Sequence, residues 1–107
     1  MSKEISGPDL AARLRSSEPT VVLDVREDWE REIGRLPGDI HIPMNDIPAR
    51  SGEIPVPPGG TVVVYCHLGV RSLMVARFLE HSGLPAVSLA GGIDAWSVEV
   101  DPSVPRY

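Results

Sequence analysis

The stretch TVVVYCHLGVRSLMVARFLEH, residues 61–81, decides the predicted fold. Its first five residues, TVVVY, are β-branched or aromatic, which is typical of a strand buried in a parallel sheet. From 72 to 81, apolar side chains cover most of the circumference of a helix, and Gly83 follows as a residue that can end it. Between strand and helix lies CHLGVRS, which contains the only cysteine of the chain, Cys66. The stretch predicts a strand–loop–helix unit with a thiol at the end of the strand.

Strands and helices alternate along the rest of the chain. The run TVVLDV, residues 20–25, is apolar apart from Asp24 and indicates another buried strand. A helix over 8–15 is indicated by the N-cap residue Ser6 and by Pro8 in its first turn. We further predict strands over 39–42 and 86–90, short helices over 27–32, 45–50 and 92–96, a loop over 51–60 and a tail over 97–107.

Alternation of this kind predicts an α/β domain with a mostly parallel sheet and helices on both faces. The length of 107 residues fits one domain over residues 1–107. In such sheets, binding and catalytic sites lie at the carboxyl ends of the strands. Cys66 is the first residue after the strand that we expect to be central, so it stands where a site is expected.

Composition and charge exclude several classes of function. The basic residues are scattered and the formal net charge is −5, which argues against a nucleic-acid partner. No apolar run reaches the roughly 20 residues of a membrane span, and the first residues lack the apolar core of a signal peptide, so we expect a cytoplasmic protein. One cysteine cannot form an internal disulfide, and the histidines show no ligand spacing. We therefore expect no metal site and no cofactor, and we take a monomer as the default oligomeric state.

The loop after the strand can activate a thiol. Gly69 permits a conformation that a Cβ would resist, and successive amides in such a turn form an anion-binding concavity. The helix that follows adds its positive end, and Arg71 adds a permanent charge at the rim or just below it. Such a setting stabilises a thiolate, so Cys66 is a candidate nucleophile. The alternative is a small buried apolar residue at a strand–helix turn.

Four motifs resemble those of one known family. C-x-x-G-x-R-S after an apolar strand, residues 66–72, resembles the active-site loop of the rhodanese family of sulfurtransferases. LDVRE, residues 23–27, looks like the family's strand and turn, and EIGRLPGDIHIP, residues 32–43, is similar to its G-H-I-P-G-A-x-x-I-P signature. LAGGIDAW, residues 89–96, looks like its G-G-x-x-x-W motif. The motifs occur in the family's order and span nearly the whole chain.

The resemblance implies a single rhodanese-like domain with a central, mostly parallel, five-stranded sheet. It implies that Cys66 takes a sulfane sulfur from thiosulfate or a protein persulfide and holds it as a persulfide. The active-site loop would then comprise His67, Leu68, Gly69, Val70, Arg71 and Ser72. A thiophilic acceptor, which is cyanide in vitro and a thiol or a sulfur-carrier protein in the cell, would take the sulfur. No second thiol is present to resolve the persulfide, so the acceptor must be external, and ping-pong kinetics are expected.

The resemblance also suggests partners. The tail VDPSVPRY, residues 100–107, resembles the C-terminal rhodanese domain of sulfur-carrier adenylyltransferases. This implies a cysteine desulfurase or a ubiquitin-like sulfur-carrier protein as a possible partner. Two residues depart from the family pattern, Arg35 where many members have histidine and Asp39 where many have alanine. We expect both to bear on the choice of partner and not on the chemistry. Whether the tail is ordered is left open by its composition.

Supporting roles are expected for a few residues outside the loop. A carboxylate inside an apolar strand must be paired, and the resemblance implies that Asp24 braces the loop with Arg26 nearby. The alternative for Asp24 is a strand end that faces the surface. Within the loop, we expect His67 and Leu68 to form the mouth of the site and Val70 to pack beneath it. A proton-transfer role for His67 is the less favoured alternative, and Trp29 and Trp96 are expected to be packing anchors.

Three other functions are compatible with parts of the pattern. A sulfur-relay module would carry a persulfide only when docked to a desulfurase or a carrier protein. An interaction domain without chemistry would have no need of a thiol at an anion-binding turn. Rhodanese-fold phosphatases and arsenate reductases carry C-x5-R, whereas Cys66 and Arg71 form C-x4-R, which implies a pocket better suited to one sulfur atom than to phosphate.

Overall fold

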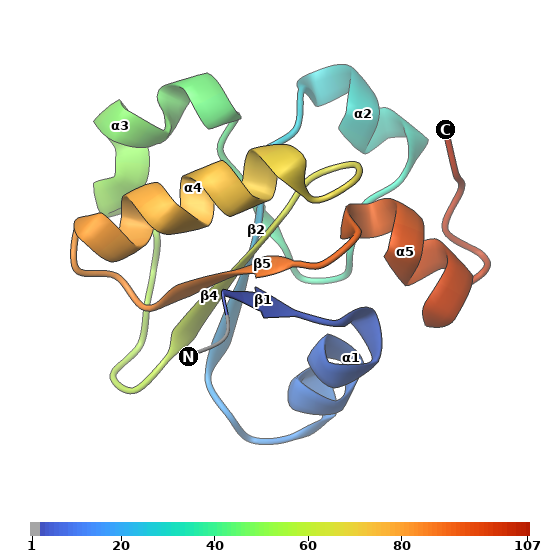
Figure 1. Cartoon of the computed structure of the whole chain (residues 1–107), viewed down its shortest axis with the longest axis horizontal. Coiled ribbons are helices and arrows are strands. Elements are labelled where there is room, and N and C mark those ends of the chain that lie inside the picture. The colour runs from blue at the N-terminus through green and yellow to red at the C-terminus, as the bar shows by residue number, and fades with distance from the viewer. Residues whose placement is uncertain (1–2) are drawn as a thin grey trace.

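The computed structural model describes residues 3–107, which form one layered α/β unit around a five-stranded sheet (Figure 1). The strand order is β1-β5-β4-β2-β3, and every pairing is parallel. The strands are β1 (Glu4–Ile5), β2 (Thr20–Asp24), β3 (Ile40–His41), β4 (Thr61–Tyr65) and β5 (Ala86–Leu89). The predicted parallel sheet is confirmed, and β4 is its central strand, as expected from its apolar composition.

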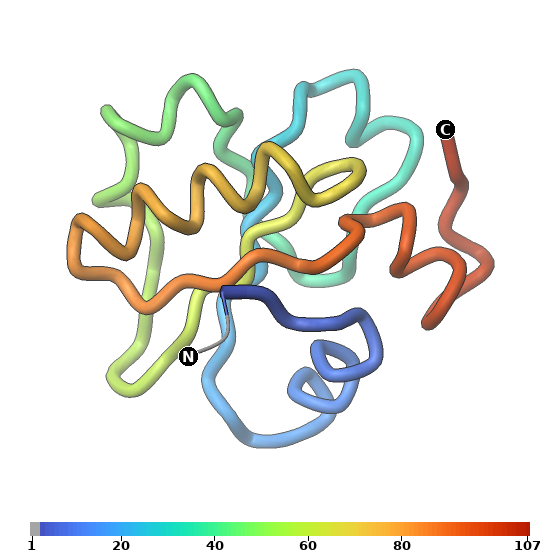
Figure 2. The backbone as a smooth tube through the Cα atoms, in the orientation of Figure 1, coloured from blue at the N-terminus to red at the C-terminus, as the bar shows by residue number. Residues whose placement is uncertain are grey.

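Helices cover both faces of the sheet, as predicted (Figures 1 and 2). Two of them, α3 and α4, lie on one face, and α1 and α5 lie on the other. The helices are α1 (Gly7–Arg15), α2 (Asp28–Ile33), α3 (Ile47–Arg50), α4 (Val70–His81) and α5 (Gly92–Glu99), with 3-10 turns at Met44–Asp46 and Ser51–Glu53. None of these helices is long and apolar enough to cross a membrane.

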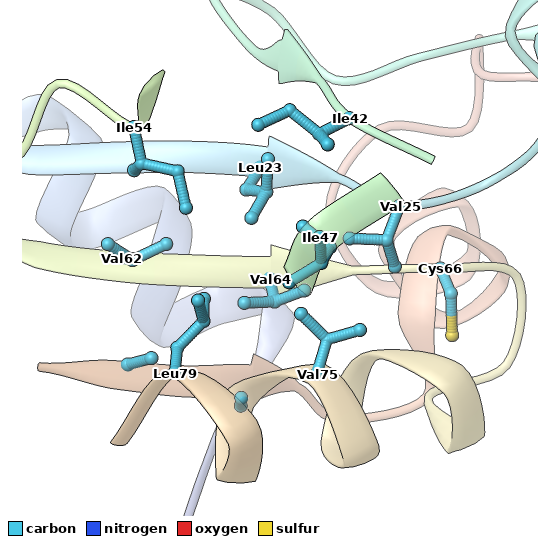
Figure 3. Close-up of a cluster of buried hydrophobic side chains, with 12 residues drawn as sticks. Leu23, Val25, Ile42, Ile47, Ile54, Val62, Val64, Cys66, Val75 and Leu79 are labelled. Carbon is cyan, nitrogen blue, oxygen red and sulfur yellow. The ribbon is translucent and has the colours of Figure 1, made fainter. Parts of the chain in front are cut away.

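Alternation along β4 divides the core in two. Val62, Val64 and Cys66 face the layer of α3 and α4, whereas Val63 and Tyr65 face the layer of α1 and α5. Cys66 therefore belongs to the first apolar cluster and lies just beyond the last strand residue, with its sulfur directed toward α4 (Figure 3). The apolar run that predicts the strand thus also fixes which side of the sheet holds the thiol.

The register of the sheet brings β2 and β4 to a common edge. Asp24 is opposite Tyr65, and the amide of Val25 continues the ladder by donating to the Tyr65 carbonyl at 3.2 Å. Arg26, two residues after β2, and Cys66, directly after β4, are thereby carried to the same end of the sheet. The carboxyl ends of the central strands meet there, as the parallel topology requires.

Several boundaries differ from those predicted. Strand β1 was not predicted, because two residues are too short to show an alternating pattern. It pairs with β5 and provides the fifth strand that the family resemblance implies. Residues 51–60, predicted as loop, begin with a 3-10 turn, and α4 begins at Val70, two residues before the predicted start.

The two tryptophans have different environments. Trp96 is buried in the second apolar cluster, so its predicted role as a packing anchor is confirmed. The same prediction is wrong for Trp29, which is 58% exposed on α2. The apolar pattern of a six-residue helix does not indicate which of its faces meets the core.

Candidate active site

The thiol of Cys66 lies at the centre of the strand–helix loop and is only 1% exposed. Its Sγ accepts hydrogen bonds from the backbone amides of Gly69 at 3.1 Å and Ser72 at 3.3 Å. The thiol hydrogen is directed to Oγ of Ser72 at 3.4 Å, and that hydroxyl is 2.7 Å from Oγ of Ser88 on β5. Two amides that point at one sulfur atom are suited to holding it as an anion.

The turn depends on Gly69. Its φ of +102° is a conformation that L residues rarely adopt, and it immediately precedes the first residue of α4. A Cβ at this position would lie 3.1 Å from the amide nitrogen of Gly91. The glycine that the sequence predicts as conformationally necessary is therefore also favoured by close packing against the loop before α5.

The N-terminus of α5 holds the loop from the other side. The amides of Ile93 and Asp94 donate to the carbonyls of Cys66 at 2.9 Å and His67 at 3.1 Å. This close approach requires Gly92, because a Cβ there would lie 2.4 Å from the His67 carbonyl oxygen. The carbonyls of the loop thus point toward α5, whereas its amides point toward the sulfur.

The first turn of α4 leaves backbone donors beside the thiol. The first four N–H groups of a helix have no acceptor within it. In α4, whose N-cap is Gly69, these are the amides of residues 69–72, and Leu73 makes the first helical bond by donating to the Gly69 carbonyl at 3.2 Å. The amides of Gly69 and Ser72 are directed to the sulfur, and the other two belong to Val70 and Arg71, which line the pocket.

A pocket of about 150 Å³ opens over the thiol and is lined by Cys66, His67, Leu68, Val70 and Arg71. Leu68 is 58% exposed at its mouth, which fits the predicted position. The prediction that Val70 packs beneath the loop is wrong, since its side chain is 70% exposed. Val70 is the first residue of α4, and its side chain lies on the outer face of the first turn.

Arg71 is paired with a carboxylate that sequence reasoning did not identify. Its two terminal nitrogens donate to Glu30 on α2 at 2.7 and 2.9 Å, a bidentate ion pair. The hydrogen bonds to Glu30 raise the pKa of Arg71 above its ordinary value. Burial opposes ionisation of Glu30, but hydrogen bonds from Arg71 and Tyr107 outweigh it and lower the pKa of Glu30 to about 2. The positive charge expected at the rim is therefore largely neutralised.

Asp24 and Arg26 form a fully buried ion pair at the end of β2. The Asp24 carboxylate accepts from the Arg26 amide and guanidinium at 2.9–3.0 Å and from Arg31 at 2.9 Å. The alternative of a surface-facing strand end is wrong. Asp24 orients Arg26, whose guanidinium donates to the Tyr107 hydroxyl at 3.1 Å, and that hydroxyl contacts Glu30. Any bracing of the loop by Asp24 therefore acts through this chain of hydrogen bonds.

Asp39 belongs to the same network. Its carboxylate accepts from Arg31 at 2.7 and 3.2 Å and from the Tyr65 hydroxyl at 2.6 Å. The network balances three carboxylates against three guanidinium groups, namely Asp24, Glu30, Asp39, Arg26, Arg31 and Arg71. The Asp39 side chain, which sequence reasoning related to partner choice, is thus 4% exposed and held in this network. No cluster of three or more metal-ligating side chains occurs among residues 3–107.

Glu30→Gln is expected to weaken the fold in a pH-dependent way. Because the pKa of Glu30 lies at about 2 in the folded state and at 4.5 ordinarily, its ionisation stabilises the fold above about pH 4.5. That contribution, about 3 kcal/mol at pH 7, is lost as the pH falls toward 2. Urea unfolding of wild type and variant from pH 7 to pH 2 measures this contribution. The difference between their free energies of unfolding should shrink as the pH falls.

Glu53→Gln is the matched control for this experiment. Glu53 also pairs with an arginine, Arg50 at 3.1 Å, but both side chains are exposed. Exposed pairs contribute little to stability, so this variant should stay close to wild type throughout. A Glu30→Gln protein that unfolds like wild type at pH 7 would contradict the assigned strength of the Glu30–Arg71 pair.

Comparison with known proteins agrees with this geometry. The family model described as "Rhodanese-like domain" matches residues 7–99. The chain is 35% identical to the protein YtwF of Bacillus subtilis (strain 168), over 94% of this chain and 95% of that protein. It is 37% identical to a protein of Allochromatium vinosum named "Sulfurtransferase", over 91% of this chain and 90% of that protein.

A solved structure, a rhodanese-like domain protein from Staphylococcus aureus, superposes with a TM-score of 0.81 at 32% identity and covers 98% of each chain. The predicted similarity to adenylyltransferase-linked domains is also confirmed. "Adenylyltransferase and sulfurtransferase MOCS3" of Aedes aegypti is 35% identical over 86% of this chain, which spans 23% of that protein. On its family match, its relatives and its fold, the chain belongs to the rhodanese-like domain family of sulfurtransferases.

Proposed function

We propose that this protein moves sulfane sulfur through a persulfide on Cys66. The donor is thiosulfate or a protein persulfide, and the acceptor is cyanide in vitro and a thiol or a sulfur-carrier protein in the cell. One observation supports this above the others, namely that two backbone amides are directed to a buried sulfur at the base of a small pocket. Cys66 has no disulfide partner in the chain, and this supports the cytoplasmic location expected from the sequence, where thiols are kept reduced.

The reaction divides into two displacements. In the first, the Cys66 thiolate attacks the outer sulfur of thiosulfate, a sulfur–sulfur bond forms, and sulfite leaves with the electron pair of the broken bond. With a protein persulfide as donor, the leaving group is the donor's thiolate. In the second, the acceptor attacks the outer sulfur and the Cys66 thiolate leaves; with cyanide the product is thiocyanate. Each step balances without an external oxidant or reductant.

Backbone amides stabilise the charge at each stage. The Gly69 and Ser72 amides hold the thiolate before attack and receive it again when the acceptor has taken the sulfur. The Val70 and Arg71 amides, in the first turn of α4, can bind the outer sulfur of the persulfide. Preorganised donors of this kind stabilise developing charge without rearrangement during the reaction.

The position of Arg71 supports sulfur over phosphate as the transferred group. A phosphatase loop needs a guanidinium free to bind the phosphate oxygens in a bidentate manner. In this protein both terminal nitrogens of Arg71 are bound to the carboxylate of Glu30. A phosphate dianion would also meet the negative charge of that carboxylate.

Steady-state kinetics with thiosulfate and cyanide test the proposal. A single covalent intermediate with no internal resolving thiol predicts ping-pong behaviour, so double-reciprocal plots at several cyanide concentrations should be parallel. Intersecting lines would indicate that both substrates bind before any transfer and would contradict a free Cys66 persulfide. Omission of the protein provides the background rate.

A sulfur-relay module is the second candidate, and an exposed apolar strip favours it. Leu68 and Val70 at the pocket mouth are followed on α4 by Met74 and Phe78, and all four side chains are substantially exposed. Contiguous exposed apolar surface is typical of protein–protein contact sites. Weak turnover with thiosulfate and cyanide, together with stoichiometric loading from a cysteine desulfurase, would favour the relay.

A further inference from the structure

The C-terminal segment returns from the end of α5 to the active-site edge of the sheet (Figures 1 and 2). It is fixed along its length, because Ser97 donates to the Val104 carbonyl at 2.6 Å and Arg106 donates to Asp94 at 2.8 Å. The composition of this segment leaves open whether it is ordered. In the structure these residues, 100–107, form an ordered strap across the surface of the protein. Its last residue, Tyr107, lies against α2 and the sulfur loop.

Tyr107 makes two kinds of contact at the site. Its ring stacks on the imidazole of His67, with centroids 3.9 Å apart and planes inclined by 10°. The rings of Trp29 and Tyr107 form a T-shaped pair, with centroids 6.0 Å apart and planes inclined by 77°. Its hydroxyl donates to the Glu30 carboxylate at 2.5 Å and accepts from Arg26 at 3.1 Å.

Each contact fixes one polar side chain of the pocket. Nε2 of His67 is buried and has no hydrogen-bond partner among the described residues, so no hydrogen bond to that atom sets the orientation of the ring. The stacked ring of Tyr107 is what holds the imidazole in place. The hydroxyl acts on Arg71, because it binds the same Glu30 carboxylate that receives both terminal nitrogens of Arg71.

We propose that Tyr107 is a positioning residue for sulfur transfer, because one side chain fixes His67 by stacking and Arg71 through Glu30. Both of these residues line the pocket with Cys66, so their positions define the space into which the donor must enter. The proposal rests on the proposed function, since it concerns the loading of Cys66. A misplacement of about 1 Å can lower a rate by roughly a hundredfold, so a smaller displacement of these pocket groups is expected to cost roughly tenfold.

The ionisation state of Tyr107 suits this role. Burial and the hydrogen bond to Glu30 raise the pKa of Tyr107 to about 12. The hydroxyl is therefore protonated at neutral pH and remains a donor to the carboxylate, while its oxygen accepts from Arg26.

Two substitutions separate the contacts. Tyr107→Phe keeps the ring and deletes the hydroxyl, whereas Tyr107→Leu deletes both contacts and keeps apolar bulk. Proton NMR reports the stack, because an aromatic ring that lies flat on an imidazole shifts its C–H resonances upfield. The His67 resonances, assigned with a His67→Gln protein, should stay upfield in Tyr107→Phe and move to ordinary positions in Tyr107→Leu. His41 and His81 serve as internal references.

The rate of persulfide formation on Cys66 is the second readout. Loading from thiosulfate should fall by roughly tenfold in Tyr107→Leu, and Tyr107→Phe should recover a part of that loss. Unchanged loading in Tyr107→Leu while the His67 resonances move would overturn the proposal. A loss of loading that accompanies altered His41 and His81 resonances would indicate general unfolding and would also overturn it.

Failure of the proposed function is distinguishable from failure of this inference. If wild type loads neither from thiosulfate nor from a desulfurase, sulfur transfer through Cys66 is wrong, whereas the NMR readout still tests whether Tyr107 fixes His67. If wild type loads normally and Tyr107→Leu is indistinguishable from it in both readouts, only the positioning role is wrong.

Discussion

Replacement of Cys66 by serine is expected to lower sulfur transfer by about three orders of magnitude or more, to the uncatalysed rate. A serine hydroxyl is a poor nucleophile toward sulfur and cannot form a persulfide. The substitution preserves a small side chain whose oxygen can still accept from the amides of Gly69 and Ser72, so the fold should persist. Thiocyanate formation from thiosulfate and cyanide measures the loss.

Two controls accompany this experiment. Thermal unfolding should show that the Cys66→Ser protein melts close to wild type, which separates lost chemistry from lost structure. Ser72→Ala keeps the thiol and the Ser72 amide and removes only the hydroxyl that lies 3.4 Å from the sulfur, so most of the activity should remain. Turnover that survives in Cys66→Ser would mean that another group carries the sulfur.

Gly92→Ala is expected to destabilise the fold by about 3 kcal/mol or more. About 1–2 kcal/mol of this is the cost of a non-glycine residue at a φ of +62°. The remainder arises because the new Cβ would lie 2.4 Å from the His67 carbonyl oxygen, so the backbone must move. That movement separates the first amides of α5 from the carbonyls of Cys66 and His67, and sulfur transfer should fall as well.

Gly59→Ala is the matched control, and urea unfolding is the measurement. Gly59 has a similar φ of +74°, but nothing lies within 4 Å of the position of its Cβ. It precedes β4, at the opposite end of the sheet from Cys66, so activity should be unchanged. Equal destabilisation by the two substitutions would show that close packing of α5 against the loop contributes nothing.

The sequence predicts those features that depend on local patterns. The apolar run of β4, the glycine at the turn and the helical pattern of α4 together place Cys66 at the carboxyl end of the central strand. Each of these signals lies within about 20 residues and reflects backbone preferences or burial. A lone aspartate in a buried strand likewise predicts that Asp24 is paired, although not with which residues.

Other features of the site depend on contacts between distant segments. Glu30 and Arg71 are 41 positions apart, and Tyr107 is 77 positions from Glu30. No local pattern distinguishes Glu30 from the neighbouring exposed acidic residues of the same short helix, since its role arises only when α2 and the strap reach the sulfur loop. For the same reason the sequence predicts a positive charge from Arg71 at the rim of the loop or just below it, but not the Glu30 carboxylate that pairs with it.

Intact mass after exposure to a sulfur donor tests the central claim most directly. Reduced wild type and Cys66→Ser are treated with excess thiosulfate, freed of the excess and weighed under non-reducing conditions. A persulfide on Cys66 predicts a gain of one sulfur atom in the wild type, reversed by cyanide and absent from the variant. Failure of the wild type to gain sulfur from thiosulfate, and again from a cysteine desulfurase supplied with cysteine, would contradict sulfur transfer through Cys66.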